Sequence, residues 1–182
     1  EYTTPYIKDA IKDAYDRLIA PAIDREIRNI LTDTAEDGAI KVFGKNLEQL
    51  LLQPPIAGKV VLGWDPAFRT GCKLAVVDPT GKVLDTKVIY PTMPHNKVAE
   101  AKAEVKKLID KYGITLISCG NGTASRESEQ IIADMIKEMN LTNVDYVITN
   151  EAGASVYSAS KLATEEFPDF DVAQRSAVSI AR

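Results

Sequence analysis

Residues 60–73, with the sequence VVLGWDPAFRTGCK, decide how the rest of the chain is organised. The apolar run at 60–62 predicts a buried strand, and this strand ends by presenting the carboxylate of Asp65. Pro66 stops the strand, a glycine-containing turn follows, and a second apolar run begins at Leu74. An acidic side chain at the end of a buried strand can serve a metal ion, a phosphate group or only a turn.

The segments that follow predict one mixed sheet. Strand patterns with short connections at 59–64, 73–77 and 83–90 predict an antiparallel meander. Two later strands, at 116–120 and 144–149, each come after a helical pattern, so we expect them to lie parallel to the first strand. The predicted fold class is α/β, with three antiparallel strands, then two parallel strands, and flanking helices. This is the strand order of the ribonuclease H-like fold, and it also describes half of an actin-type or Hsp70-type ATPase.

Residues 1–52 predict an N-terminal helical appendage, because apolar side chains recur every three or four residues. Pro21 interrupts this pattern and predicts a kink or a fresh helix start. Thr32 or Asp33 can cap the next helix, and the Gln-Pro-Pro sequence at 53–55 is expected to end it.

Two domains are therefore expected. Residues 1–56 are interpreted as the end of an upstream helical region, and residues 57–182 as the ribonuclease H-like domain. Small residues at 154–163 predict one helix, and a last helix is predicted to start near Val172. Because no helix stop signal precedes Arg182, we expect a piece of a longer protein, cut in or after its last helix.

Composition limits the classes of function. The net charge of −4 and the pI of about 5.1 count against a stand-alone nucleic-acid binder, which is usually basic, but they do not exclude a local basic patch. Cys72, Cys119 and the single histidine, His95, lack metal-ligand spacing, so no zinc site is expected. Reduced thiols fit a cytoplasmic protein. No apolar run approaches the roughly 18 residues of a membrane span, so no membrane partner is expected.

Polar side chains gather in the turns where the predicted parallel strands end. Strand ends of the same polarity meet at one edge of a sheet, and ligands bind there in folds of this kind. The candidates are Asp65, Arg69, Thr70 and Lys73 after the first strand, Asn121, Thr123, Ser125 and Arg126 after the fourth, Glu151 after the fifth, and Asp171 before the last helix.

One interpretation of this edge is a metal-dependent nuclease. Two-metal cleavage needs several carboxylates; Asp65, Glu151 and Asp171 are the candidate catalytic residues, with Asp65 and Glu151 as ligands of Mg²⁺ or Mn²⁺. Asn121 at the tip of the fourth strand argues against this interpretation, because an amide is a poorer Mg²⁺ ligand than a carboxylate. Each acid also has a structural interpretation, as a turn residue for Asp65 and at a helix start for Glu151 and Asp171.

The other interpretation is a site for nucleic-acid phosphates. Residues 122–125 open a helix, whose free N–H groups suit anions, although an ordinary strand-to-helix turn has the same pattern. The expected phosphate-binding residues are Arg69, Thr70, Lys73, Asn121, Thr123, Ser125 and Arg126.

Several long runs resemble the Tex family of bacterial transcription accessory proteins. They are LLLQPP at 50–55, GWDPAFRTGCKLAVVD at 63–78, GNGTASRE at 120–127, NEAGASVYSAS at 150–160 and DVAQRSAVSIAR at 171–182. The resemblance covers nearly the whole chain. It implies a YqgF-like domain, related to Holliday-junction resolvases, with a helical region before it and helix-hairpin-helix segments and an S1 RNA-binding domain after it.

The resemblance also implies where acids would stand in a working resolvase. Asp65 matches the acid after the first strand, and Glu151 approximates a later one. Asn121 departs from the acid near the fourth strand, and Arg175 and Ser176 stand where the last helix would carry another.

The hypothesis from the sequence is a non-catalytic, nucleic-acid-associated scaffold domain of a transcription accessory protein. The expected partner is RNA or DNA in the context of the full-length protein, together with the transcription machinery, and no cofactor is expected. The alternative is a resolvase-like nuclease that uses Mg²⁺ or Mn²⁺ at Asp65, Glu151 and Asp171.

Overall fold

The computed structural model describes residues 2–52 and 56–182. The chain divides into two compact units, Glu1–Gln53 and Pro54–Arg182. None of the described helices has an apolar stretch of the length and hydropathy that crossing a bilayer requires.

The first unit is helical from Thr4 onward. Helix α1 (Thr4–Ala14) continues through a π-helical turn, η1 (Tyr15–Ile19), into helix α2 (Ala20–Leu51). The π turn lies directly before Pro21, which has no N–H to donate and stands in the first turn of α2. The interruption predicted at Pro21 is thus a local widening of the helix.

The helix start predicted at Thr32 or Asp33 is wrong, because both residues lie inside α2. Neither breaks the helical ladder, and the next hydroxyl, that of Thr34, donates to the Ile30 carbonyl at 2.7 Å within the helix. The stop predicted at 53–55 falls outside the described residues.

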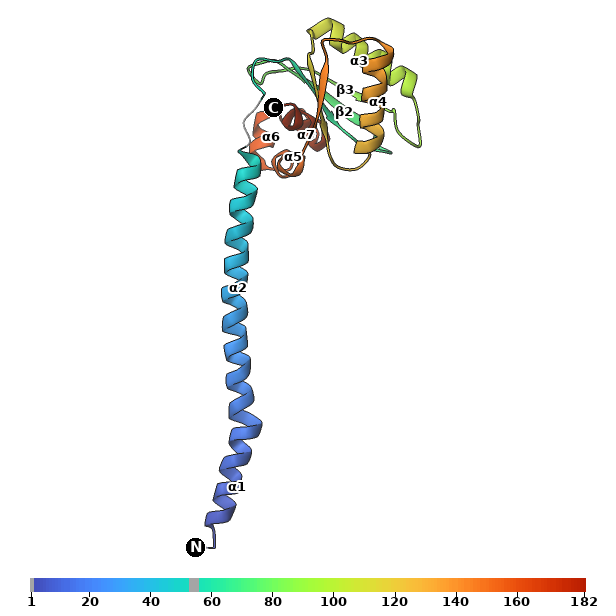
Figure 1. Cartoon of the computed structure of the whole chain (residues 1–182). Coiled ribbons are helices and arrows are strands. Elements are labelled where there is room, and N and C mark those ends of the chain that lie inside the picture. Colours follow the sequence, from blue (N-terminus) through green and yellow to red (C-terminus); the bar gives the residue numbers. More distant parts are fainter. Residues whose placement is uncertain (1, 53–55) are drawn as a thin grey trace. The chain divides into compact units, whose positions relative to one another are not determined.

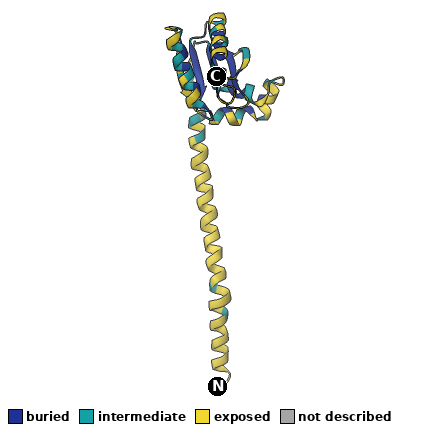
Figure 2. Ribbon diagram, turned by 90° about the vertical axis from the view of Figure 1, so that its right-hand side faces the viewer, coloured by how far each residue is buried: buried dark blue, intermediate teal, exposed yellow. Residues whose placement is uncertain are grey.

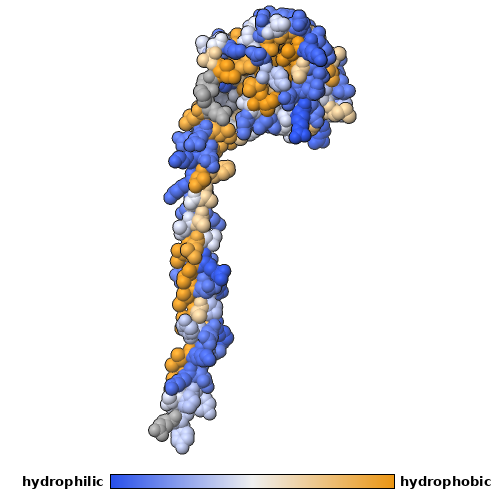
Figure 3. Space-filling model, in the orientation of Figure 1, coloured by the Kyte–Doolittle hydropathy of each residue, from blue (hydrophilic) through white to orange (hydrophobic). Residues whose placement is uncertain are grey.

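Apolar side chains gather along one side of the first unit (Figure 3). Ile11, Ile27 and Phe43 are 64%, 51% and 71% exposed, and none of the described side chains of this unit is buried. Among the described residues, the buried hydrophobic core therefore lies in the second unit.

The second unit contains the predicted mixed sheet (Figure 1). Its strands are β1 (Val61–Asp65), β2 (Cys72–Val77), β3 (Val83–Ile89), β4 (Leu116–Gly120) and β5 (Asp145–Thr149), in the spatial order β3-β2-β1-β4-β5. The β1–β2 and β2–β3 pairs are antiparallel, and the β1–β4 and β4–β5 pairs are parallel. The expectation that the two late strands run parallel to the first strand is confirmed.

Helices cover both faces of this sheet, so the central strands are buried between them (Figure 2). Helices α3 (Val98–Tyr112) and α4 (Ser125–Glu138) pack on one face, where Leu62 and Trp64 of β1 join the main core. Helix α7 (Val172–Ala181) packs on the other face, against β1 and β2. Successive side chains of a strand point to opposite faces, so Val61, Gly63 and Asp65 point toward α7.

The single helix predicted at 154–163 is two helices, α5 (Ala152–Ser158) and α6 (Lys161–Glu166). Ser160 separates them in an extended conformation, and its hydroxyl accepts a hydrogen bond from the Ala163 N–H at 3.1 Å. An N-cap residue has a non-helical backbone. Because Ser160 is the N-cap of α6, the helical path is interrupted between α5 and α6.

Helix α7 approaches β1 closely because residue 63 is glycine. A Cβ atom at Gly63 would lie 2.1 Å from the Ala177 carbonyl oxygen and 2.8 Å from the Ala181 Cβ. One of these atoms belongs to the backbone of α7 and the other to a short alanine side chain, so neither can move away unless the helix shifts.

We predict that Gly63→Ala lowers the free energy of unfolding of the second unit by about 1 to 3 kcal/mol, because the added methyl group overpacks this contact. Urea denaturation followed by Trp64 fluorescence would measure the change. Gly44→Ala is the matched control, since Gly44 lies in α2 with no atom near its missing Cβ. Equal midpoints for parent and Gly63→Ala would contradict the prediction.

Candidate functional site

Asp65 is the last residue of β1 and points toward the N-terminal half of α7. Burial raises the pKa of its carboxyl group from 3.8 to about 6; contact with the Ser176 side chain and the nearby charge of Lys73 lower it, while the charges of Glu151 and Asp171 raise it. The structure therefore brings three of the predicted acids into electrostatic reach of one another.

Glu151 follows β5 and lies against the turn after β4. A Cβ atom at Gly122 would lie 1.7 Å from its Oε1, and one at Gly120 would lie 2.3 Å from its Oε2. Glycines at these two positions leave room for the carboxylate in the orientation that it adopts. Its Oε2 is buried without a hydrogen-bond partner, next to the position where Pro66 and Ile180 approach Gly120. Asp65 and Glu151 thus come together at the edge of the sheet.

Asp171 has a structural role. Its Oδ1 accepts from the Gln174 N–H at 2.7 Å, and the Gln174 side chain accepts from the Asp171 N–H at 3.0 Å, which makes a capping box at the start of α7. Within 2–52 and 56–182, no three Asp, Glu, His or Cys side chains are close enough to hold a metal ion together. The donor set does not fit a two-metal site, which needs three or four carboxylates.

Asn121, the residue that departs from the resolvase pattern, also has a structural contact. Its Oδ1 accepts a hydrogen bond from the Glu151 N–H at 3.2 Å. The amide therefore ties the turn after β4 to the turn after β5, and it fixes the backbone from which the Glu151 side chain projects.

The resemblance implies an acid at Arg175 or Ser176. The side chains of these two residues point in different directions. Arg175 is buried, and its guanidinium donates to the Phe167 carbonyl at 3.1 Å and to the Thr164 hydroxyl at 2.9 Å. It holds the segment before α7 and takes no part at the sheet edge. Ser176 is the residue of α7 that contacts Asp65.

Lys73 is buried beside Asp65, which it faces across the β1–β2 pair. Its ammonium group donates to the Thr70 carbonyl at 2.8 Å and to the Gly71 carbonyl at 2.9 Å. The structure thus uses Lys73 to hold the loop between β1 and β2, and does not present it at the surface as a phosphate ligand.

The other candidates of the predicted phosphate site surround the start of α4 and the β1–β2 loop. No side chain caps α4, and its N-cap residue, Ala124, has a φ of 62°. The exposed side chains there are those of Arg69, Thr70, Thr123 and Arg126, with Ser125 partly buried.

Two contacts of the β1–β2 loop were not predicted from the sequence. The Thr92 hydroxyl donates to the Ala67 carbonyl at 2.7 Å, and His95 Nε2 donates to the Arg69 carbonyl at 3.2 Å. They join segments about 25 residues apart, and no local pattern signals such a pairing. His95, which the sequence left without a role, thus holds the loop that carries Arg69.

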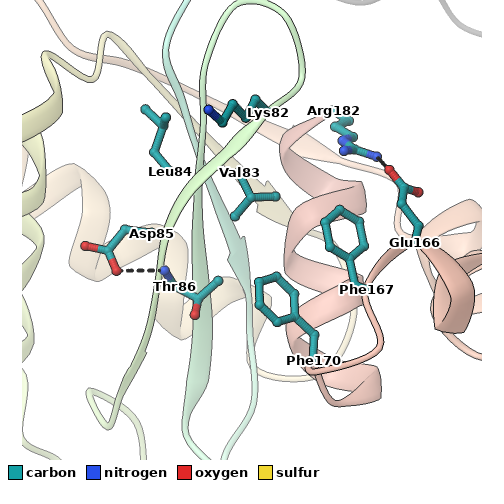
Figure 4. Close-up of a pocket in the computed structure, with 9 residues that line it drawn as sticks. All are labelled: Lys82, Val83, Leu84, Asp85, Thr86, Glu166, Phe167, Phe170 and Arg182. Carbon is teal, nitrogen blue, oxygen red and sulfur yellow. Dashed lines mark hydrogen bonds and ion pairs between the residues drawn. The ribbon is translucent and has the colours of Figure 1, made fainter.

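A hollow of about 510 Å³ lies between β3 and the segment that carries Phe167 and Phe170, and neither Asp65 nor Glu151 lines it (Figure 4). The rings of Phe167 and Phe170 stack there with centroids 5.2 Å apart, and Arg182 pairs with Glu166 at 2.6 Å. Val83 lines this hollow and pairs with Val77 of β2. Val77 in turn pairs with Val61, the first residue of β1. The hollow is therefore separate from the edge that carries Asp65.

We predict that Asp65→Asn stabilises the protein at pH 7.5. The folded state holds a proton on Asp65 up to about pH 6, whereas the unfolded chain releases it near 3.8, so stability falls as pH rises between these values. One pKa unit corresponds to about 1.4 kcal/mol, so the variant should gain about 1 to 3 kcal/mol at pH 7.5, and its advantage should vanish near pH 3.

Urea denaturation at several pH values would measure this difference. Asp78→Asn is the control of opposite sign, because hydrogen bonds from Thr80 and Lys82 lower the pKa of the Asp78 carboxyl group. That variant should be less stable than the parent at pH 7.5. An Asp65→Asn protein that is less stable than the parent at pH 7.5 would contradict the prediction.

Comparison with known proteins agrees with this architecture. Residues 59–182 match the family model of the Tex protein YqgF-like domain. The chain is 59% identical over 176 residues to the uncharacterized protein YdcI of Bacillus subtilis, covering 97% of this chain and 24% of YdcI. It is 42% identical over 177 residues to the transcriptional accessory protein Tex of Neisseria gonorrhoeae, covering 97% of this chain and 23% of that protein.

A human relative is similar to the same degree. The S1 RNA-binding domain-containing protein 1 of Homo sapiens is 42% identical over 177 residues, covering 96% of this chain and 18% of that protein. The chain thus spans about a quarter or less of the length of these relatives.

Among solved structures, a Thermus thermophilus RuvC structure matches with a TM-score of 0.50 at 16% identity, covering 67% of this chain and 90% of the RuvC chain. This likeness and the strand order β3-β2-β1-β4-β5 confirm the ribonuclease H-like fold. With a YqgF-like match over residues 59–182 and Tex relatives aligned along nearly its whole length, the chain belongs to the Tex family of transcription accessory proteins.

Proposed function

We propose that this domain is a nucleic-acid-associated scaffold without catalysis of its own, within a cytoplasmic transcription accessory protein. The proposal is carried by the contacts that the polar residues at the sheet edge make. Asn121 and Asp171 are engaged in backbone hydrogen bonds, and Lys73 holds a loop. Of the acids predicted at this edge, Asp65 and Glu151 remain, within electrostatic reach of each other. Such an edge keeps the framework of a resolvase site but lacks the carboxylates that two-metal cleavage needs.

Association with nucleic acid is supported by the relatives and by the surface. The relatives include a transcriptional accessory protein and an S1 RNA-binding domain-containing protein. Arg69 and Arg126 are exposed, on the β1–β2 loop and the first turn of α4, and no ion pair is found for either among the described residues. Two free guanidinium groups on neighbouring turns suit phosphate contacts despite the net charge of −4.

A resolvase-like nuclease is the second candidate function. The pair formed by Asp65 and Glu151 favours it, because a buried, unpartnered carboxylate oxygen on Glu151 is costly unless some ligand uses it. A cleavage assay with branched DNA, single-stranded DNA and RNA in Mg²⁺ or Mn²⁺ separates the two candidates. Cleavage that disappears in Asp65→Asn would establish the nuclease and refute the scaffold.

We predict that the chain binds single-stranded nucleic acid with an affinity that falls as salt rises, and does not cleave it. Each phosphate contact on a single strand contributes about 0.7 to the slope of log K against log salt, so Arg69→Ala should reduce the slope by about 0.7. Fluorescence anisotropy at several salt concentrations would measure this change.

Lys82→Ala is the matched control for Arg69→Ala. It removes one positive charge from the turn before β3, at the opposite end of the sheet from Asp65, and should leave the slope unchanged. Equal slopes for Arg69→Ala and the parent would show that the edge carrying Arg69 is not the binding surface.

A further inference from the structure

A second cavity, of about 450 Å³, lies beside the predicted phosphate-binding residues. It is an open hollow, lined by residues of the segment 91–98 and of the first two turns of α4. Pro91, Met93 and Ile131 supply apolar walls, and Asn96, Gln130 and Arg126 supply polar groups at its rim. This volume and this mixture of apolar walls with a few polar groups are typical of a site for a small organic group.

The wall of this cavity is joined to the loop that carries Arg69. Between Pro91 and Asn96, the Thr92 hydroxyl holds the Ala67 carbonyl and His95 holds the Arg69 carbonyl. The Tyr90 ring lies against Gly71, where a Cβ atom would come within 2.6 Å of it. The cavity and the Arg69 loop are therefore parts of one continuous, internally bonded surface.

Positive charge lies at the cavity and on the loop that is bonded to its wall. Arg126 stands at its rim, on a helix start that no side chain caps, and Arg69 stands on the adjoining loop. Glu127 also lines the cavity and supplies an acceptor there. An occupant with an apolar ring, hydrogen-bonding edges and neighbouring phosphates matches these aliphatic walls, side-chain amides and guanidinium groups.

We propose that the cavity receives one unstacked nucleobase of a single-stranded nucleic acid, with the flanking phosphates held by Arg69 and Arg126. The base lies against Met93, Pro91 and Ile131, and the side-chain amides of Asn96 and Gln130 meet its edge. His95 acts as a positioning residue, because it holds the Arg69 carbonyl and does not line the cavity. This inference rests on the proposed nucleic-acid association and assigns its surface.

The test uses the 182-residue chain and a single-stranded oligonucleotide with one 2-aminopurine, whose fluorescence reports whether that base is stacked. We expect the fluorescence to change when the chain binds. Met93→Ala should weaken binding about three- to tenfold and reduce the fluorescence change, with an unchanged salt slope, because it removes only apolar contact. Arg126→Ala should reduce the salt slope by about 0.7.

The controls separate binding from folding. Met93 is 65% exposed and Arg126 is exposed, so thermal unfolding of both variants should match that of the parent. Lys137→Ala removes one positive charge near the other end of α4, and should change neither the slope nor the fluorescence.

Two negative results have different meanings. Binding that leaves 2-aminopurine fluorescence unchanged, together with parental affinity in Met93→Ala, overturns the base pocket and leaves nucleic-acid association standing. Absence of binding at low salt overturns the proposed association and the pocket together.

Discussion

The close contact between β1 and α7 is the constraint on which the rest of the second unit depends. Gly63 allows the Ala177 carbonyl to approach the strand to a distance that any side chain would prevent. The next residue on the same face of β1 is Asp65, and two residues nearer the start of α7, Ser176 and the N-cap Asp171, lie within reach of that carboxylate. The environment of Asp65 is therefore set by packing two residues away.

The polar groups at the sheet edge of this ribonuclease H-like fold mostly bind other parts of the same edge. Asn121 ties two turns together, Asp171 caps a helix and Lys73 holds loop carbonyls. Each of these contacts gives a backbone N–H or C=O group a hydrogen-bond partner. Asp65 and Glu151 are the exceptions, because burial raises the pKa of the Asp65 carboxyl group and Glu151 keeps an unpartnered oxygen.

The surface that we propose for nucleic acid carries two exposed arginines. Arg69 and Arg126 are exposed on turns that follow β1 and β4, and the segment that holds the Arg69 loop also forms one wall of the neighbouring cavity. A chain with a net charge of −4 can therefore present a local basic surface without being basic overall. In this arrangement the backbone-holding contacts of Thr92 and His95 link the strand-end turns to the α4 side of the sheet.

The amino-acid sequence by itself determined the strand order, the direction of each strand and the position of Asp65 at a strand end, because these follow from local periodicity and from the short or helical connections between strands. Only the tertiary structure decided what the edge residues do. The sequence could not show that Lys73 turns inward, that Arg175 turns away or that His95 reaches Arg69. Each of these outcomes depends on the direction of one side chain in a packed environment, or on contacts between segments far apart in the chain, and neither is encoded in local spacing.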